Sequence, residues 1–112
     1  MRLEEKTLLH DVLIAAERIE SFTFGKGFPT YQVNDMLRSA VERQLEIIGE
    51  ALNPLSRVSP DIAGRITEYQ RIIAFRNILI HGYAQVDNRL VWSVVDDKLP
   101  VLLVQVRQLL EE

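Results

Sequence analysis

The chain contains no cysteine, which excludes a disulfide-stabilised scaffold, thiolate metal ligands and thiol catalysis. It has only two histidines and no His-x-x-x-His or Glu-x-x-His pair, so the usual spacing of a zinc or di-iron site is absent. No run approaches the roughly 18 apolar residues that a membrane-spanning helix needs, and no apolar segment follows the charged N-terminus as in a secretion signal. We therefore expect a cytoplasmic protein with no metal, no other cofactor and no membrane segment.

The composition is that of a globular protein. Of the 112 residues, 47% are hydrophobic and 26% are charged, which fits one folded domain spanning residues 1–112. The net charge of −3 argues against a protein that coats nucleic acid through a broad basic field, but it leaves room for a small cationic site. Because a chain of this length buries a modest core, a dimer would add useful burial.

Hydrophobic periodicity predicts an all-α chain of four or five helices. A first helix is expected over residues 3–21, followed by a loop over residues 22–29. A second helix is expected to begin near Asn34, a plausible N-cap, or a turn earlier. We expect it to end before Pro54, because the residue preceding a proline is disfavoured in the α region.

The second half of the chain repeats this helical pattern. Ser59 and Pro60 open a short helical segment, and a longer helix is expected from about Thr67 to His81. Gly82 would end that helix in the left-handed conformation. Asp87-Asn88 would cap the last helix, and Pro100 should kink or break it near residues 98–99.

One short segment concentrates side chains with chemical function. Within residues 76–83 stand Arg76, Asn77, His81 and Tyr83. A guanidinium holds phosphate oxygens with its planar fork, and an imidazole transfers protons near neutral pH. RNA carries its own nucleophile in the 2′-hydroxyl, so a base, an acid and a cationic clamp suffice to cut it without metal.

The spacing of this pair constrains how one chain can use it. Five residues on an ideal helix separate Arg76 from His81 by about 140° and about 7.5 Å of rise, so the two side chains do not share one stripe. A two-fold dimer would supply two histidines, one to accept a proton and one to donate it. In the alternative interpretation the segment is only a helix end, where Arg76 pairs with an acid and Tyr83 packs on the core.

The segment resembles the Arg-x4-His-x-Tyr motif of HepT-like toxins, which belong to the HEPN superfamily of helical ribonucleases and nucleotide-associated domains. Residues 40–51 are similar to the second-helix signature of that family, and residues 91–100 to its C-terminal region. The likeness covers nearly the whole chain.

This resemblance implies a HEPN-type helical bundle that forms a two-fold homodimer. It also implies a metal-independent endoribonuclease that leaves a 2′,3′-cyclic phosphate. His81 would act as base or acid, Arg76 would stabilise the charge of the phosphorane, and Asn77 would orient a neighbour or the RNA substrate.

The resemblance further implies a toxin–antitoxin partnership. A small nucleotidyltransferase antitoxin would neutralise the toxin by attaching AMP to Tyr83, adding bulk and negative charge beside Arg76 and His81. Two alternatives stay open: a non-catalytic binding module that partners a nucleotidyltransferase, and a structural dimer whose motif is only a helix cap.

Other polar and aromatic residues receive simpler interpretations. Glu42, Arg43, Glu46 and Glu50 have helical spacings typical of ion pairs, with the alternative that one acid orients Arg76 or His81 across the bundle. Five further residues are expected to pack on the core or to lie in solvent: His10, Arg65, Phe75, Arg89 and Trp92. Arg71 would extend the positive potential near Arg76.

Overall fold

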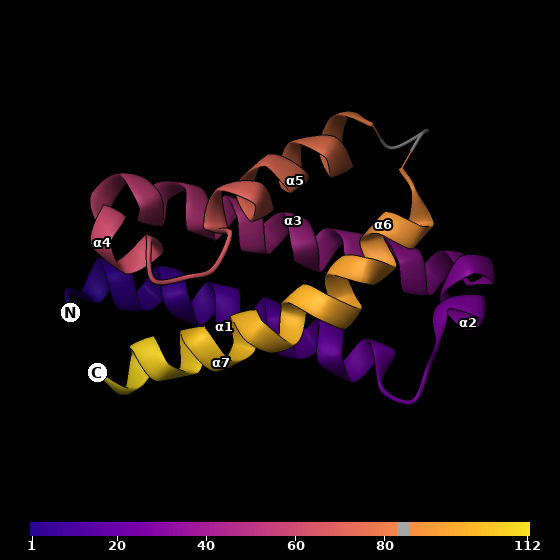
Figure 1. Cartoon of the computed structure of the whole chain (residues 1–112), viewed down its shortest axis with the longest axis horizontal. Helices are drawn as coiled ribbons and strands as arrows, with labels where there is room; N and C mark the ends of the chain where they lie inside the picture. The colour runs from indigo at the N-terminus through magenta and orange to yellow at the C-terminus, as the bar shows by residue number, and fades with distance from the viewer. Residues whose placement is uncertain (83–85) are drawn as a thin grey trace.

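The computed structural model describes residues 1–82 and 86–112, and every regular element in those ranges is helical, as the periodicity predicted (Figure 1). The molecule measures 42 × 29 × 19 Å. In chain order its elements are α1 (Leu3–Thr23), α2 (Phe28–Val33), α3 (Asp35–Val58), α4 (Pro60–Ala63), α5 (Tyr69–His81), α6 (Asn88–Ser93), the π-helix η2 (Val94–Lys98) and α7 (Leu99–Glu111).

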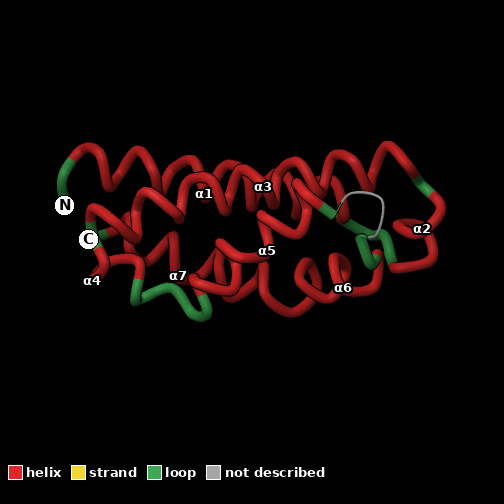
Figure 2. The backbone as a smooth tube through the Cα atoms, turned by 90° about the horizontal axis from the view of Figure 1, so that it is seen from above, coloured by secondary structure: helices red, strands yellow, loops and turns green. Residues whose placement is uncertain are grey.

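The core lies where α1 packs against α3 and α7 (Figures 1 and 2). The long helices alternate in direction, so the two chain ends meet at one end of the bundle (Figure 1). Side chains on the inner stripes of these helices are fully enclosed because their apolar positions recur at helical spacing. They include Leu9, Val12, Ile19, Val41, Ile48, Leu52, Val106 and Leu109.

Two predicted helix caps are confirmed. The Asn34 carboxamide accepts a hydrogen bond from the backbone N–H of Leu37 at 2.9 Å and begins α3. The Asp87 carboxylate accepts from the N–H of Arg89 at 2.9 Å and begins α6. Each cap supplies an acceptor to backbone donors that have no partner within the helix.

Two predicted boundaries are wrong. The loop expected over residues 22–29 ends earlier, because Pro29 occupies the first turn of α2, where its missing N–H costs nothing. The second helix does not end before Pro54 but continues to Val58. The continuation buries Leu55 completely, and this burial offsets the one backbone hydrogen bond that a proline removes.

Gly82 ends α5 as predicted, but not in the left-handed conformation. Its φ is −108°, and its N–H donates to the carbonyl of Ile78 at 2.8 Å. A Cβ at this position would lie 2.8 Å from the same carbonyl oxygen. Close backbone approach, and not a positive φ, therefore favours glycine here.

The predicted disturbance around Pro100 is confirmed as a π-helix. Residues of η2 run from Val94 to Lys98, and Pro100 lies in the first turn of α7 immediately afterwards. A proline in a helix removes a hydrogen bond and crowds the preceding turn, which the wider π-turn relieves. The register shift lets Val95, Leu99 and Leu102 all face the core.

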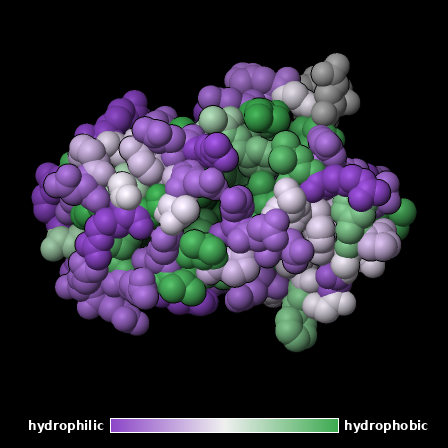
Figure 3. Space-filling model, in the orientation of Figure 1, coloured by the Kyte–Doolittle hydropathy of each residue, from purple (hydrophilic) through white to green (hydrophobic). Residues whose placement is uncertain are grey.

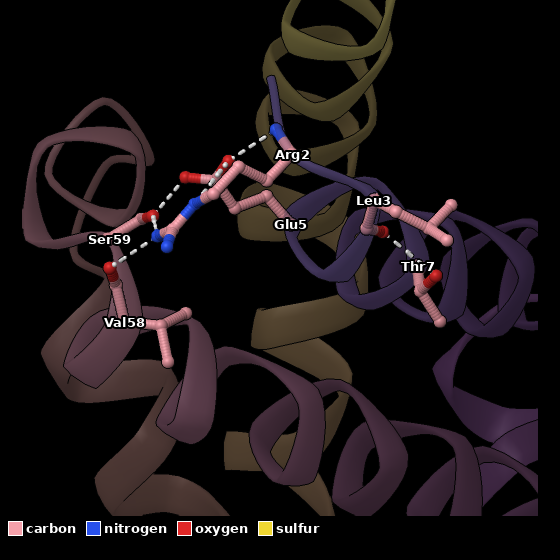
Figure 4. A network of polar contacts seen from close by, with 6 residues as sticks. All are labelled: Arg2, Leu3, Glu5, Thr7, Val58 and Ser59. Atoms are coloured by element: carbon pink, nitrogen blue, oxygen red, sulfur yellow. Dashed lines mark hydrogen bonds and ion pairs between the residues drawn. The ribbon is translucent and has the colours of Figure 1, made fainter.

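A buried carboxylate ties the start of α1 to the junction of α3 and α4 (Figure 4). Glu5 accepts hydrogen bonds from the Ser59 hydroxyl and from the Arg2 backbone N–H, the latter at 2.7 Å. The Arg2 guanidinium donates to the carbonyl of Val58 at 3.0 Å. The hydrogen bond from Ser59, followed by that from Arg2, holds the pKa of Glu5 below its ordinary value of 4.5.

This network predicts a pH-dependent contribution to stability. Because the pKa of Glu5 is lowered in the folded state, its carboxylate stabilises the fold at neutral pH, and this contribution is lost as the pH falls through the folded pKa. We expect Glu5→Gln to lower the free energy of unfolding near neutral pH, with the gap to wild type narrowing below 4.5. Denaturant titrations across this range measure it, with exposed Glu4→Gln as the control. A gap that stays constant with pH would contradict the assignment.

Candidate functional site

Helix α5 carries the predicted motif and is apolar on nearly every side. Its apolar residues point in all directions around the axis, yet only Leu79 is fully buried. A helix that is apolar all round normally lies inside a core. Here one long side faces out, where Ala74 and Ile78 are exposed, Ile78 by 49%. Figure 3 shows apolar surface gathered over the C-terminal half of this helix and in the hollow beside it.

Arg76 lies where α5 contacts α3. A Cβ placed on Gly49 of α3 would lie 2.5 Å from the Cβ of Arg76 and 3.1 Å from its Cγ, so the missing side chain creates the space that the arginine stem occupies. The Arg76 side chain is 34% exposed. Its Nε is enclosed without a hydrogen-bond partner among the described residues. The base of the side chain is therefore fixed against α3, while the end of the guanidinium reaches solvent.

Two groups flank the guanidinium of Arg76. Its Nη1 donates to the Asn77 side-chain oxygen at 3.4 Å, and its Nη2 lies 3.9 Å from a carboxylate oxygen of Glu50. The same oxygen of Glu50 lies 3.3 Å from Nη1 of Arg43, which also contacts Glu46 at 3.4 Å. Arg43, Glu46 and Glu50 thus form ion pairs, as their helical spacings predicted, and the series of pairs ends on Arg76. Glu42, predicted with them, makes no ion pair among the described residues.

His81 is the last residue of α5 and is exposed, as is Asn77. Because α5 is a regular helix between Arg76 and His81, the two side chains leave it on different sides, about 140° apart. The structure thus brings Arg76 and Asn77 together, and it places His81 beyond them on the outward side with Ala74 and Ile78. Tyr83 lies outside the described residues.

The two described cavities lie apart from the motif residues of α5. The larger, of about 310 Å³, separates α5 from α6, η2 and α7; its lining includes Leu45, Arg71, Ile72, Phe75, Val94 and Lys98. A smaller one of about 180 Å³ adjoins Trp92 at the far end of η2. Neither is lined by Arg76, Asn77 or His81. Arg71 therefore contributes its charge to the larger groove rather than to the surface beside Arg76.

The aromatic residues pack as predicted. Phe75 and Trp92 are half-buried against the core, and the Trp92 ring lies 5.2 Å from that of Tyr31. Tyr31 is fully enclosed, and burial raises the pKa of its hydroxyl. Burial, reinforced by the charge of Glu46, also raises the pKa of Glu42. Tyr31, Glu42 and Trp92 belong to the region where α2, α3 and α6 pack together.

No group of three or more His, Cys, Asp or Glu side chains is placed to hold a metal ion within residues 1–82 and 86–112. None of the helices in that part of the chain is both long and apolar enough to cross a membrane.

Sequence reasoning missed Gly49 as part of the site. A signal was present, since a glycine in the interior of an amphipathic helix costs about 1 kcal/mol relative to alanine and so points to close packing at that position. The pattern along the chain gave no indication of which helix would approach it.

Comparisons with known proteins identify the family of this chain. The family model described as "Ribonuclease HepT-like" matches residues 12–109. A Methanocaldococcus jannaschii protein named "Putative RNase MJ1380" is 34% identical over 99 residues, covering 85% of this chain and 86% of that protein. A Thermococcus cleftensis protein named "Probable ribonuclease HepT" is 36% identical, with 91% and 92% covered.

A further relative is longer than this chain. It is the M. jannaschii "Gamma-glutamylcyclotransferase and putative RNase MJ0434", which is 33% identical over all of this chain, and the chain spans 50% of its length. No solved structure matches the chain significantly. The family match extends over most of the chain and includes both the α3 segment around Gly49 and the α5 segment around Arg76 and His81. The chain therefore belongs to the HepT-like ribonuclease family.

Proposed function

We propose that this protein is the ribonuclease toxin of a toxin–antitoxin pair and cuts RNA in the cytoplasm without a metal ion. The observation that carries the proposal is the placement of Arg76 and His81 on one helix, with the guanidinium fixed at its base and the imidazole exposed at the helix end. The family match supports the activity.

The chemistry follows from the two side chains. An imidazole takes the proton of the RNA 2′-hydroxyl, the 2′-oxygen attacks the adjacent phosphorus, and the bond to the 5′-oxygen breaks. A second group donates a proton to the leaving 5′-oxygen, so the products are a 2′,3′-cyclic phosphate and a 5′-hydroxyl. The guanidinium of Arg76 stabilises the extra negative charge on the phosphorane, while Asn77 holds one edge of that guanidinium.

One chain supplies half of this arrangement. The mechanism needs an acid and a base, while His10, the other histidine, lies on α1 and away from the motif. The outward side of α5 presents Ala74 and Ile78 beside His81, an apolar strip that a second copy would bury. A two-fold axis there brings both His81 side chains to one cleft.

The first test compares the two histidines. We expect wild-type protein to cleave single-stranded RNA in EDTA, and His81→Ala to lower the rate by about 100-fold or more, the range typical of a lost general acid or base. His10→Ala is the matched control and should retain full activity. Equal rates for His81→Ala and wild type would refute the proposed mechanism, as would a strict requirement for added divalent metal.

The second test addresses the shared cleft. Ile78→Asp places a charge on the apolar strip of α5, so we expect it to produce monomers in sedimentation experiments and to abolish cleavage. Val104→Asp is the control, because Val104 on α7 is similarly exposed, by 53%. A monomeric Ile78→Asp protein that still cleaves RNA at the wild-type rate would show that one chain suffices.

We also propose that a nucleotidyltransferase antitoxin switches the enzyme off by transferring AMP to Tyr83. The support is its position in the sequence, two residues after His81. A phosphodiester-linked nucleotide there would place bulk and negative charge where the RNA phosphate has to bind.

Mass spectrometry tests the modification. Protein produced together with such an antitoxin should gain the mass of one or more AMP units and lose its ribonuclease activity, and Tyr83→Phe should show neither change. If Tyr83→Phe gained the same AMP mass as wild type, the modification would lie on another residue. An unmodified chain held inactive by the partner would favour the binding-module interpretation.

A further inference from the structure

We propose that Gly49 and Glu50 of α3 are positioning residues for Arg76, with Gly49 setting where the arginine stem lies and Glu50 aiming its guanidinium. This inference rests on the proposed ribonuclease function and identifies which acid of α3 serves the site. It concerns two neighbouring residues on a helix that carries neither Arg76 nor His81.

The first step is steric. Any side chain at position 49 would meet the Cβ of Arg76 at 2.5 Å, and a Cβ, unlike the end of a long side chain, cannot move without moving its helix. Gly49 is buried, the Cβ and Cγ of Arg76 lie directly over it, and the Nε of Arg76 is enclosed. The absence of a side chain at position 49 therefore determines where the guanidinium begins.

The second step is electrostatic. Glu50 on α3 and Asn77 on α5 contact different ends of the Arg76 guanidinium, at 3.9 Å and 3.4 Å. Both carboxylate and guanidinium are partly exposed, so this pair contributes little to the stability of the fold. The pair instead restricts the orientation of the Arg76 guanidinium, because a planar group contacted from two sides has fewer orientations open to it.

Arg43 makes this arrangement compatible with substrate binding. The Glu50 oxygen that faces Arg76 also faces Arg43, which is closer at 3.3 Å. Arg43 therefore keeps the charge of Glu50 compensated when Arg76 turns to a phosphate. A carboxylate without this second partner would compete with the RNA for Arg76 and repel it.

The experiment compares two neighbouring acids. Glu50→Gln keeps the shape of the side chain and removes its charge, and Glu46→Gln does the same one turn away, where the carboxylate contacts Arg43 but not Arg76. We expect Glu50→Gln to lower kcat about tenfold with KM unchanged or lower, since misaligned groups lose transition-state stabilisation first. Glu46→Gln should keep kcat within about two-fold. A drop in KM alone, with kcat unchanged, would overturn the inference.

A double variant separates positioning from a structural role. If Glu50 acts through Arg76, adding Glu50→Gln to Arg76→Ala should lower the residual kcat no further. A further tenfold loss in the double variant would show that Glu50 acts by another route.

Gly49→Ala provides a second route to the same conclusion. We expect it to remain folded, by circular dichroism, while its kcat falls at least as far as that of Glu50→Gln. Wild-type kcat in folded Gly49→Ala would overturn the steric step. Failure of the proposed function is distinguishable, because it would show as RNA cleavage that does not depend on His81.

Discussion

The contact of α5 with α3 at Gly49 and Arg76 is the one on which the rest of this site depends. It holds the one helix that carries both proposed catalytic side chains against the helical core. It also fixes the rotation of α5 about its own axis, so that Phe75 and Ile72 face the groove toward α7 while Ala74, Ile78 and His81 face outward. A small change at this contact would move every functional group on the helix together.

The rotation of α5 explains why one chain alone forms only part of the proposed catalytic cleft. The described groove is concave and apolar but is lined by neither Arg76 nor His81. His81 lies on the outward side of the helix, whereas Arg76 lies where α5 contacts α3, with the end of its guanidinium reaching solvent. Catalytic sites work best where water is limited and charges are held in place. A second copy placed over the outer side of α5 would supply both the missing wall and the second histidine.

The sequence predicted much of the helical architecture, because caps and periodicity act locally. Asn34 and Asp87 begin helices since their side chains accept from nearby backbone donors, and Pro100 disturbs its own turn. Two of the failures had tertiary causes. Pro54 stays inside α3 because burial of Leu55 outweighs one lost hydrogen bond, and Gly82 is selected by the closeness of a carbonyl rather than by its φ.

The residues of the candidate site likewise fall into two groups, those that the sequence identified and those that only the structure shows. Arg76 and His81 stand out in the sequence through residue type and spacing, and the structure places both on α5 but on different sides of that helix. The neighbours that hold Arg76 are Gly49 and Glu50, which lie 27 and 26 residues earlier in the chain, and no local rule specifies which helices cross at that point. The sequence offered three acids of α3 that could orient Arg76 or His81, namely Glu42, Glu46 and Glu50. Only the crossing of the helices shows that Glu50 is the one that reaches Arg76.

The most direct test of the central claim is where RNA binds on α5. Nuclear magnetic resonance can follow the side chains of Arg76, His81 and Phe75 while the protein is titrated with an RNA that carries a 2′-deoxy nucleotide at the cleavage position and so cannot react. The account predicts that the Arg76 and His81 signals shift together with one affinity while that of Phe75, in the groove, stays in place. Shifts confined to Phe75 and the groove would contradict it.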